Sequence, residues 1–192
     1  MTASNPPRLV RLDDLPRQPW RNGGGTTREL LTWPDAADWQ VRVSAADVQQ
    51  DGAFSAYPGV QRWIVVLKGS GLALDIDAVA HRLDRNAAPL CFDGAAATHC
   101  RLLDGPTLDL NLMLRGLPGR LLPALDGAPW QPTLEQCGLF ATVPGRCRCA
   151  DGADTALPAY ALLWFDRAPT ALTFEAAQRP SAATGWWLEA GT

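Results

Sequence analysis

A succession of short apolar segments with the two-residue periodicity of β-strands constrains the fold of this chain more than any other feature. Most of these segments are bounded by Gly, Pro, Asp or Asn, which favour turns and interrupt strands. The pattern is typical of an all-β sandwich or barrel. We predict strands at residues 9–15, 26–33, 39–46, 62–68, 72–76, 89–92, 99–103, 108–115, 160–165, 172–175 and 186–189.

Residues 116–132 interrupt this pattern with the proline- and glycine-rich sequence GLPGRLLPALDGAPWQP. We interpret this stretch as a connector between a denser N-terminal half and a looser C-terminal half. The only helix candidates, residues 120–125 and 133–137, are too short and too interrupted by proline to build a helical layer. Hydrophobic residues make up 47% of the chain, which is ample for a packed core.

The net charge, the apolar segments and the cysteines of the chain argue against several classes of function. The formal net charge of −3 argues against a nucleic-acid footprint. No apolar run has the length of a signal peptide or a membrane span, so we expect neither export nor membrane insertion. The five cysteines form an odd set, as expected of reduced thiols in a cytoplasmic protein. Cys147 and Cys149 lack a second ligand pair at suitable spacing, which argues against a zinc site.

Two of the predicted strands carry a regular polar face. In the segment LDLNLML, the leucines share one face while Asp109, Asn111 and Met113 share the other. In WQVRVS, Arg42 and Ser44 oppose an apolar face in the same way. One interpretation is a sheet with one solvated face. The alternative, favoured by a methionine among the polar side chains, is that these faces line the mouth of a barrel that holds one small ligand.

The stretch WRNGGGTTRE, residues 20–29, does not fit a nucleotide-binding loop. A Walker loop needs a lysine after its glycines, and a Rossmann loop lies between a strand and a helix, whereas here a predicted strand follows. KGSGLA, at residues 68–73, reads as a hairpin turn between two strands. No G-x-S-x-G sequence supports a catalytic serine. We expect the three glycines to let the backbone turn sharply toward the pocket and start the next strand.

The remaining polar residues form a set suited to binding a small anion. Arginine can hold a carboxylate with two parallel hydrogen bonds, and asparagine offers both a donor and an acceptor. The alternative is that these residues occupy ordinary solvated sheet positions. The candidate ligand-binding residues are Trp20, Asn22, Thr27, Glu29, Arg42, Ser44, Phe54, Ser55, Arg62, Asp109, Asn111 and Met113.

Several of these residues lie in segments that, taken together, resemble the HutD/Ves family of small bacterial bicupin proteins. The matching segments are WRNGGGTTREL, WQVRVSAA, GAFSAYPG with the following Arg62, LKG, PLCFDG and DGPTLDLNLMLR, in that order over residues 8–116. The resemblance implies an all-β cupin fold, an RmlC-like jelly-roll double barrel, with both barrels in one chain. Residues 1–116 would form the first barrel with the pocket. Residues 117–192 would form the connector and a smaller barrel completed by N-terminal strands, the whole being one compact unit.

The resemblance also bears on metal and function. A metal cupin carries an H-x-H…E set, and GAFSAYPGVQRWIVVLKG lacks those histidines, so we expect no metal and no cofactor. Members of the HutD branch are associated with histidine utilisation. They are thought to bind an intermediate such as formylglutamate or urocanate and to moderate expression of the pathway. On this basis Arg42 and Arg62 would hold the carboxylate of a small metabolite.

In that arrangement Asn22, Ser44 and Asn111 would orient the rest of the ligand. The apolar walls would be Trp20, Phe54 and Met113.

Two other function classes stay open at the level of sequence. The first is a metal-independent isomerase or hydrolase of a small carboxylic acid, with Glu29 or Asp109 as acid or base, although both carboxylates can equally be structural partners of arginines. The second is an interaction module whose tryptophan-rich C-terminal half forms a subunit interface. A homodimer is compatible with the sequence, whereas nucleic acid and membrane are not expected as partners.

Overall fold

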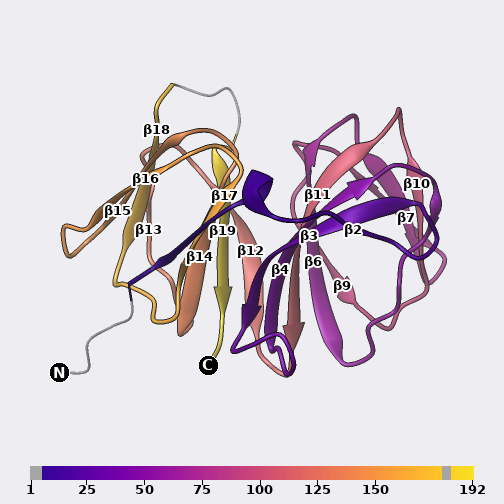
Figure 1. Cartoon of the computed structure of the whole chain (residues 1–192), viewed down its shortest axis with the longest axis horizontal. Coiled ribbons are helices and arrows are strands. Elements are labelled where there is room, and N and C mark those ends of the chain that lie inside the picture. The colour runs from indigo at the N-terminus through magenta and orange to yellow at the C-terminus, as the bar shows by residue number, and fades with distance from the viewer. Residues whose placement is uncertain (1–5, 179–182) are drawn as a thin grey trace. The chain divides into compact units, whose positions relative to one another are not determined.

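The computed structural model describes residues 6–178 and 183–192, and this part of the chain is almost entirely β-structure. The described residues form 19 strands and one short 3₁₀ helix, which confirms the predicted all-β class. The chain divides into two compact units (Figure 1). One unit is Leu15–Gly116, and the other combines Met1–Asp14 with Leu117–Thr192.

The unit Leu15–Gly116 consists of two antiparallel sheets. Its strands are β2 (Gln18–Pro19), β3 (Gly25–Trp33), β4 (Val41–Val48), β5 (Gly52–Ala53), β6 (Val60–Lys68), β7 (Leu72–Ile76), β8 (Val79–Leu83), β9 (Leu90–Asp93), β10 (Thr98–Leu102) and β11 (Thr107–Arg115). The six-stranded sheet has the order β2-β3-β4-β11-β6-β9, and the four-stranded sheet has the order β5-β10-β7-β8. Strands distant in sequence are therefore neighbours, as in a jelly roll.

The second unit also has two antiparallel sheets. Its elements are β1 (Arg8–Arg11), η1 (Leu12–Asp14), β12 (Gly119–Ala124), β13 (Pro129–Trp130), β14 (Gln136–Ala141), β15 (Gly145–Cys149), β16 (Asp154–Leu157), β17 (Ala161–Phe165), β18 (Leu172–Ala176) and β19 (Gly185–Ala190). The sheet orders are β1-β17-β14-β19-β12 and β13-β18-β15-β16. In both units the described strands form separate sheets, not a hydrogen-bonded closed barrel.

The core of the first unit follows from the strand periodicity recognised in the sequence. Leu72, Leu74 and Ile76 alternate along β7 and are buried in one cluster with Ile64 and Val66 of β6. Each of these side chains points from one sheet toward the other because alternate residues of a strand face opposite sides. Burial of such side chains contributes about 1.5–3 kcal/mol each to stability.

The expectation that residues 116–132 form a connector is wrong, and neither helix candidate is helical in the structure. Residues 116–132 contain β12 and β13, and the candidates at 120–125 and 133–137 overlap β12 and β14. Both segments adopt strand conformation because β12 and β14 each pair with β19 in the same sheet. β12 tolerates Pro123 because it is the edge strand of its sheet, where a missing N–H donor leaves no partner unpaired.

The predicted strand at residues 72–76 coincides with β7, and the ends of the other predicted strands are shifted by at most two residues, except in the first strand. There, residues 12–14 form the 3₁₀ helix η1 instead of continuing β1. Eight of the described strands are not among the predicted ones: β2, β5 and β8 of the first unit and β12 to β16 of the second. The segments that form β14, β15 and β16 show why such strands are hard to predict. Their sequences contain glycine, cysteine and charged residues, which obscure the apolar alternation.

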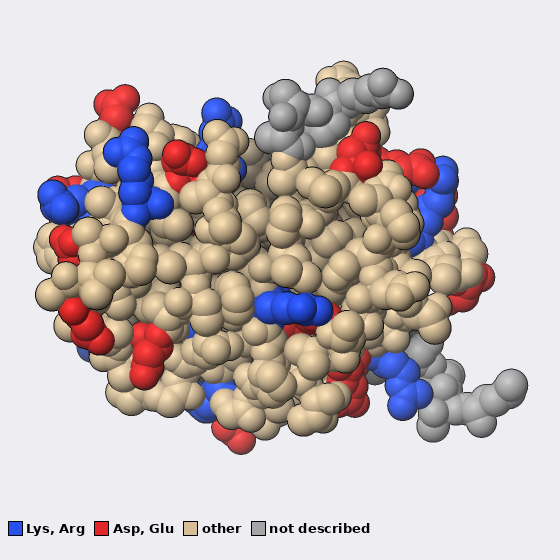
Figure 2. Space-filling view, turned by 180° about the vertical axis from the view of Figure 1, so that it is seen from behind, with Lys and Arg blue, Asp and Glu red and all other residues tan. Residues whose placement is uncertain are grey.

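Charged side chains of both signs occur together on the face of the molecule that Figure 2 draws. On the face drawn in Figure 2, basic side chains are separated from one another and interspersed with acidic ones, with broad uncharged areas between them. Within residues 6–178 and 183–192, no helix has the length and hydropathy needed to span a bilayer. The cytoplasmic location stays a prediction.

Candidate functional site

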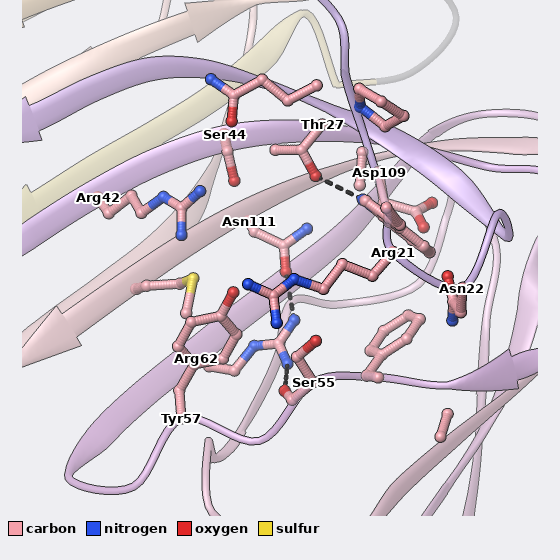
Figure 3. Close-up of a pocket in the computed structure, with 17 residues that line it drawn as sticks. Arg21, Asn22, Thr27, Arg42, Ser44, Ser55, Tyr57, Arg62, Asp109 and Asn111 are labelled. Carbon is pink, nitrogen blue, oxygen red and sulfur yellow. Dashed lines mark hydrogen bonds between the residues drawn. The ribbon is translucent and has the colours of Figure 1, made fainter.

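A cavity of about 390 Å³ lies within the unit Leu15–Gly116 (Figure 3). It is lined by residues of β2, β3, β4, β5, β6 and β11 and by the segments that precede β3 and β6. Its volume falls in the range of small-molecule sites, which begins at about 300 Å³. The lining combines aromatic side chains with arginine, asparagine, serine and aspartate. The site therefore suits a small polar ligand.

Strand register places the polar side chains in rows across the sheet. On β11 and β4, Asn111 lies opposite Ser44, and Met113 lies opposite Arg42. On the other side of β11, Met113 also lies opposite Arg62 of β6. Asn111 and Ser44 are each only 5% exposed, so the interpretation of a solvated sheet face is wrong. These polar residues line the cavity instead.

Arg62 is the central charged group of the cavity. It is 7% exposed, and its Nη2 donates a hydrogen bond to Oδ1 of Asn111 at 3.0 Å. Nη1 makes a longer contact of 3.5 Å with the carbonyl oxygen of Ser55. Among the described residues no carboxylate pairs with it. Burial lowers the pKa of Arg62 to about 10, which still leaves the guanidinium charged at neutral pH.

Three aromatic rings surround this guanidinium. The ring centroids of Phe54, Tyr57 and Phe92 lie 5.4, 5.7 and 5.0 Å from its central carbon. Cations within about 6 Å of an aromatic ring face are attracted by the ring quadrupole. The rings hold Arg62 in place without neutralising its charge, so the charge stays available to an anion in the cavity.

Two further arginines line the cavity. Figure 3 shows the side chains of Arg21 and Arg42 directed into the space that Arg62 also enters. Nε of Arg42 lies 3.0 Å from a carboxylate oxygen of Glu29 on β3. Arg21 is exposed and forms no ion pair with any residue that the structure describes. The cavity therefore concentrates positive charge that the chain itself only partly balances.

Asp109 is the only carboxylate in the described lining. Its side chain is 0% exposed, and Oδ2 accepts a hydrogen bond from the hydroxyl of Thr107 at 3.2 Å. Its other oxygen, Oδ1, is buried and has no hydrogen-bond partner within the described residues. Burial raises the pKa of Asp109 to about 8, with a smaller contribution in the same direction from Asp47. Burial therefore favours the protonated, neutral form of this carboxyl group.

The glycine-rich turn brings Trp20 to the cavity. Trp20 donates from Nε1 to the hydroxyl of Thr27 at 2.8 Å and contacts Phe54 edge-on. Gly23 has a φ of 71°, which favours glycine. A Cβ on Gly25 would lie 2.2 Å from the backbone oxygen of Asp47, so only glycine allows this close approach between β3 and β4. Gly23 and Gly25 thus shape the turn.

Most of the sequence-predicted site residues lie together around the cavity. Glu29 is the exception, because it pairs with Arg42 and does not belong to the described lining. The predicted set lacks Arg21, although this residue lies between two of its members. Those that line the cavity are Trp20, Asn22, Thr27, Arg42, Ser44, Phe54, Ser55, Arg62, Asp109, Asn111 and Met113. Their role in binding stays a prediction.

The donor set of the cavity does not fit a transition metal. Zinc, iron and similar ions are held by several imidazole, thiolate or carboxylate ligands. The described lining offers one carboxylate, and neither His81 nor His99 belongs to it. His81 lies on β8 and His99 on β10. Within the described residues, no group of three or more His, Cys, Asp or Glu side chains is arranged to hold a metal ion.

Two jelly-roll units in one chain, one with an arginine-lined cavity, define a two-domain cupin-type protein. Residues 12–183 match the family model described as HutD, and the chain belongs to the HutD family. The resemblance drawn from the sequence and the cupin-type fold are both confirmed.

Solved structures support this assignment over nearly the whole chain. HutD from Pseudomonas fluorescens SBW25, in a formate condition, superposes with a TM-score of 0.81 at 25% identity, covering 96% of this chain and 98% of that one. A conserved protein of unknown function from Pseudomonas aeruginosa PAO1 gives a TM-score of 0.85 at 30% identity, with coverage of 98% and 100%. Ylba from E. coli, at 9% identity and a TM-score of 0.69, shares the fold alone.

Curated relatives match a shorter stretch. An uncharacterised 21.2 kDa protein in the hutC 3′ region of Pseudomonas putida is 38% identical over 109 residues, which cover 55% of this chain and 56% of that protein. Protein Ves of Citrobacter koseri is 38% identical over 104 residues, covering 53% and 54%. The match therefore spans little more than half the length of each of these relatives.

Proposed function

We propose that this protein binds a small carboxylated metabolite in the cavity without a metal ion and, as a sensor, moderates histidine utilisation. The observation that carries the proposal is the buried guanidinium of Arg62, which lacks a carboxylate partner among the described residues. A buried charge is unfavourable unless it is paired. An anionic ligand would supply the pair, and a carboxylate matches the planar guanidinium with two parallel hydrogen bonds.

The charge balance of the cavity favours a ligand with two negative charges. Arg21, Arg42 and Arg62 line it, whereas burial disfavours the charged form of Asp109 and Glu29 balances only Arg42. Formylglutamate carries two carboxylates at neutral pH and urocanate carries one. Of these two candidates, formylglutamate therefore suits the site better.

The names of the relatives agree with this proposal. The Pseudomonas putida relative is described by its position in the hutC 3′ region, and the Pseudomonas fluorescens structure is a HutD. That structure is of a formate condition, and formate is the smallest carboxylate. The names of these relatives support a connection with histidine utilisation as a property of this chain.

Calorimetry with N-formyl-L-glutamate and with urocanate tests the proposal. We expect binding by the wild type and a loss of at least about 30-fold in affinity for Arg62→Met, since removing one partner of a buried charged hydrogen bond costs roughly 2–5 kcal/mol. The matched control is Arg101→Met, because Arg101 lies on β10 with its side chain 58% exposed. Absence of binding by both acids at millimolar concentration would remove the proposal.

A metal-independent isomerase or hydrolase is the second candidate, and one observation favours it. The pKa of Asp109, raised to about 8 by burial, lies close to the pH at which a general acid or base is most effective. Glu29 is a weaker choice because it does not line the described cavity. Product formation from either acid by the wild type, lost in Asp109→Asn while binding persists, would establish the enzyme. Unchanged substrate after prolonged incubation would leave only the binding function.

A further inference from the structure

The side chains that line the cavity differ in exposure, and this difference defines a mouth and an interior. In the interior, Arg62, Asn111 and Ser44 are each at most 7% exposed. The exposed lining residues come from β2 and the turn that follows it, and from β5 and the stretch after it. We call these residues the mouth, and they are Gln18, Pro19, Arg21, Asn22, Ala53 and Ser55.

Arg21 is the only charged residue of this mouth, as far as the lining is described. Among the residues that the structure describes, no carboxylate pairs with it. Figure 3 shows its side chain reaching from the turn before β3 toward the space that Arg62 enters. The charge of Arg17, which precedes β2, is balanced because its Nη1 lies 2.6 Å from a carboxylate oxygen of Asp47. An anion that approaches the cavity therefore meets the charge of Arg21 first.

The backbone around Arg21 is held by hydrogen bonds, whereas its side chain is not. The amide of Trp20 donates to the carbonyl oxygen of Gly25 at 2.9 Å, and the amide of Gly23 donates to that of Trp20 at 3.0 Å. No hydrogen bond to a described residue orients the guanidinium of Arg21. Immobilising such a long side chain on a ligand costs conformational entropy. Arg21 thus supplies a charge at the mouth without a prearranged binding geometry.

Arg62 has the opposite character. Its guanidinium is oriented by Asn111 and surrounded by the rings of Phe54, Tyr57 and Phe92. Because Arg62 is already held in place, it loses little further freedom when it binds an anion. Its interaction with a buried anion is also screened by salt much less than an interaction at the surface. Arg62 is therefore suited to hold a ligand that has entered.

We propose that the two arginines have separate roles in binding: Arg21 captures the anion at the mouth, and Arg62 retains it in the interior. This inference rests on the proposed function and adds the route by which the ligand enters. Exposed charges chiefly change the rate of association and its dependence on salt, whereas buried charge pairs change the rate of dissociation. Loss of Arg21 should slow association, and loss of Arg62 should speed dissociation.

NMR exchange measurements on the formyl proton of N-formyl-L-glutamate give both rate constants, because this proton reports on the free and the bound acid. At 10 mM salt, where the Debye length is about 30 Å, we expect Arg21→Met to lower the association rate constant about threefold. A dianion attracted by one positive charge roughly 10 Å away in water accounts for an effect of this size. The dissociation rate constant should change by less than about 1.5-fold. At 1 M salt, where the Debye length is about 3 Å, the difference in association should disappear.

Three further variants separate capture from other effects of charge. Arg21→Lys keeps the charge but loses the planar guanidinium, and it should restore most of the association rate that Arg21→Met loses. Arg101→Met removes the same charge from an exposed side chain of β10 outside the described lining, and it should slow association much less. Arg62→Met should raise the dissociation rate constant at least about tenfold at both salt concentrations, because a buried charge is screened little.

The outcomes separate this inference from the proposed function. If the wild type does not bind N-formyl-L-glutamate, the proposed function fails and the capture role fails with it. If the acid binds but Arg21→Met associates as fast as the wild type at 10 mM salt, or no faster than Arg101→Met slows it, the capture role is overturned and the site at Arg62 stands. Faster dissociation from Arg21→Met that persists at 1 M salt and is not restored by Arg21→Lys would make Arg21 a direct ligand contact, which also overturns the capture role.

Discussion

Nη2 of Arg62 on β6 donates a hydrogen bond of 3.0 Å to Oδ1 of Asn111 on β11. The partner is a neutral amide, so the bond orients the guanidinium without cancelling its charge. Asn111 in turn lies opposite Ser44 of β4, so three neighbouring strands position the same group. In a structural ion pair, a carboxylate would occupy the place that this amide takes.

Replacing that amide by a carboxylate should convert the site into an ion pair. In Asn111→Asp, the new carboxylate would neutralise Arg62 and repel an anionic ligand. We expect affinity for N-formyl-L-glutamate to fall by at least about 50-fold, since like charges in a buried site cost several kcal/mol. The free energy of unfolding should rise, because a lone buried charge gains a partner.

Calorimetry and urea unfolding measure the two effects. Asn86→Asp is the matched control because Asn86 is exposed and lies outside the described cavity lining. Wild-type affinity in Asn111→Asp would mean that Arg62 does not bind the acid.

The three glycines of the turn before β3 should differ in their tolerance of alanine. A Cβ on Gly25 would lie 2.2 Å from the backbone oxygen of Asp47, and we expect Gly25→Ala to cost about 2 kcal/mol or more. Gly23, with a φ of 71°, should cost about 1 kcal/mol. At Gly24 the nearest atom is Oδ1 of Asn22 at 3.4 Å, so alanine should be nearly neutral. Urea unfolding of the three variants should rank them in this order, and an equal effect at all three would contradict the geometry.

Stability should depend on pH through Asp109. The unfolded chain releases this proton near the ordinary pKa of 3.8, whereas the folded protein retains it up to about pH 8. The folded state therefore binds more protons between these values, and its stability falls as pH rises through this window. Asp109→Asn removes this contribution.

Melting temperatures of wild type and Asp109→Asn between pH 4 and pH 9 test this sign. The advantage of the variant over the wild type should grow as pH rises to about 8 and then level off, with Asp38→Asn as the control. A difference that stays constant with pH would show that Asp109 ionises normally in the folded protein.

The thiols should react with iodoacetamide according to their burial. Cys91 is exposed and Cys149 is half-buried, whereas Cys100, Cys137 and Cys147 are buried. Burial also raises the pKa of Cys100 and Cys147 to about 12, which suppresses the reactive thiolate. Mass spectrometry of the native protein at pH 8 should find Cys91 modified first, and the buried thiols only after unfolding. Early modification of Cys137 would indicate that the core of the second unit opens readily.

The site residues that can be predicted from the sequence are those that lie on strands with a regular two-residue alternation of polar and apolar side chains. Asp109, Asn111 and Arg42 alternate with apolar residues, so a two-residue repeat is enough to place each on the polar face of its strand. Arg21 cannot be found this way because it lies in a turn, where no repeat fixes the direction of a side chain. The charge of Glu29 makes it a candidate, but its ion pair with Arg42 depends on the register between β3 and β4.

The strands of the fold also differ in how well the local sequence predicts them. The predicted bounds of β7 match the observed ones because Leu72, Leu74 and Ile76 alternate without interruption. The sequence of β12 resembles a connector or a short helix because Pro123 and the flanking glycine break the local pattern. Its strand conformation is set by pairing with β19, a segment more than 60 residues away, which the local sequence does not encode.

A crystal structure of the wild type with N-formyl-L-glutamate tests the central claim most directly. We expect the acid inside the cavity of the unit Leu15–Gly116, with a carboxylate within about 3 Å of the guanidinium of Arg62, the distance of a charge-assisted hydrogen bond. An empty cavity at a saturating concentration of the acid, or a transition metal coordinated at its centre, would contradict the account.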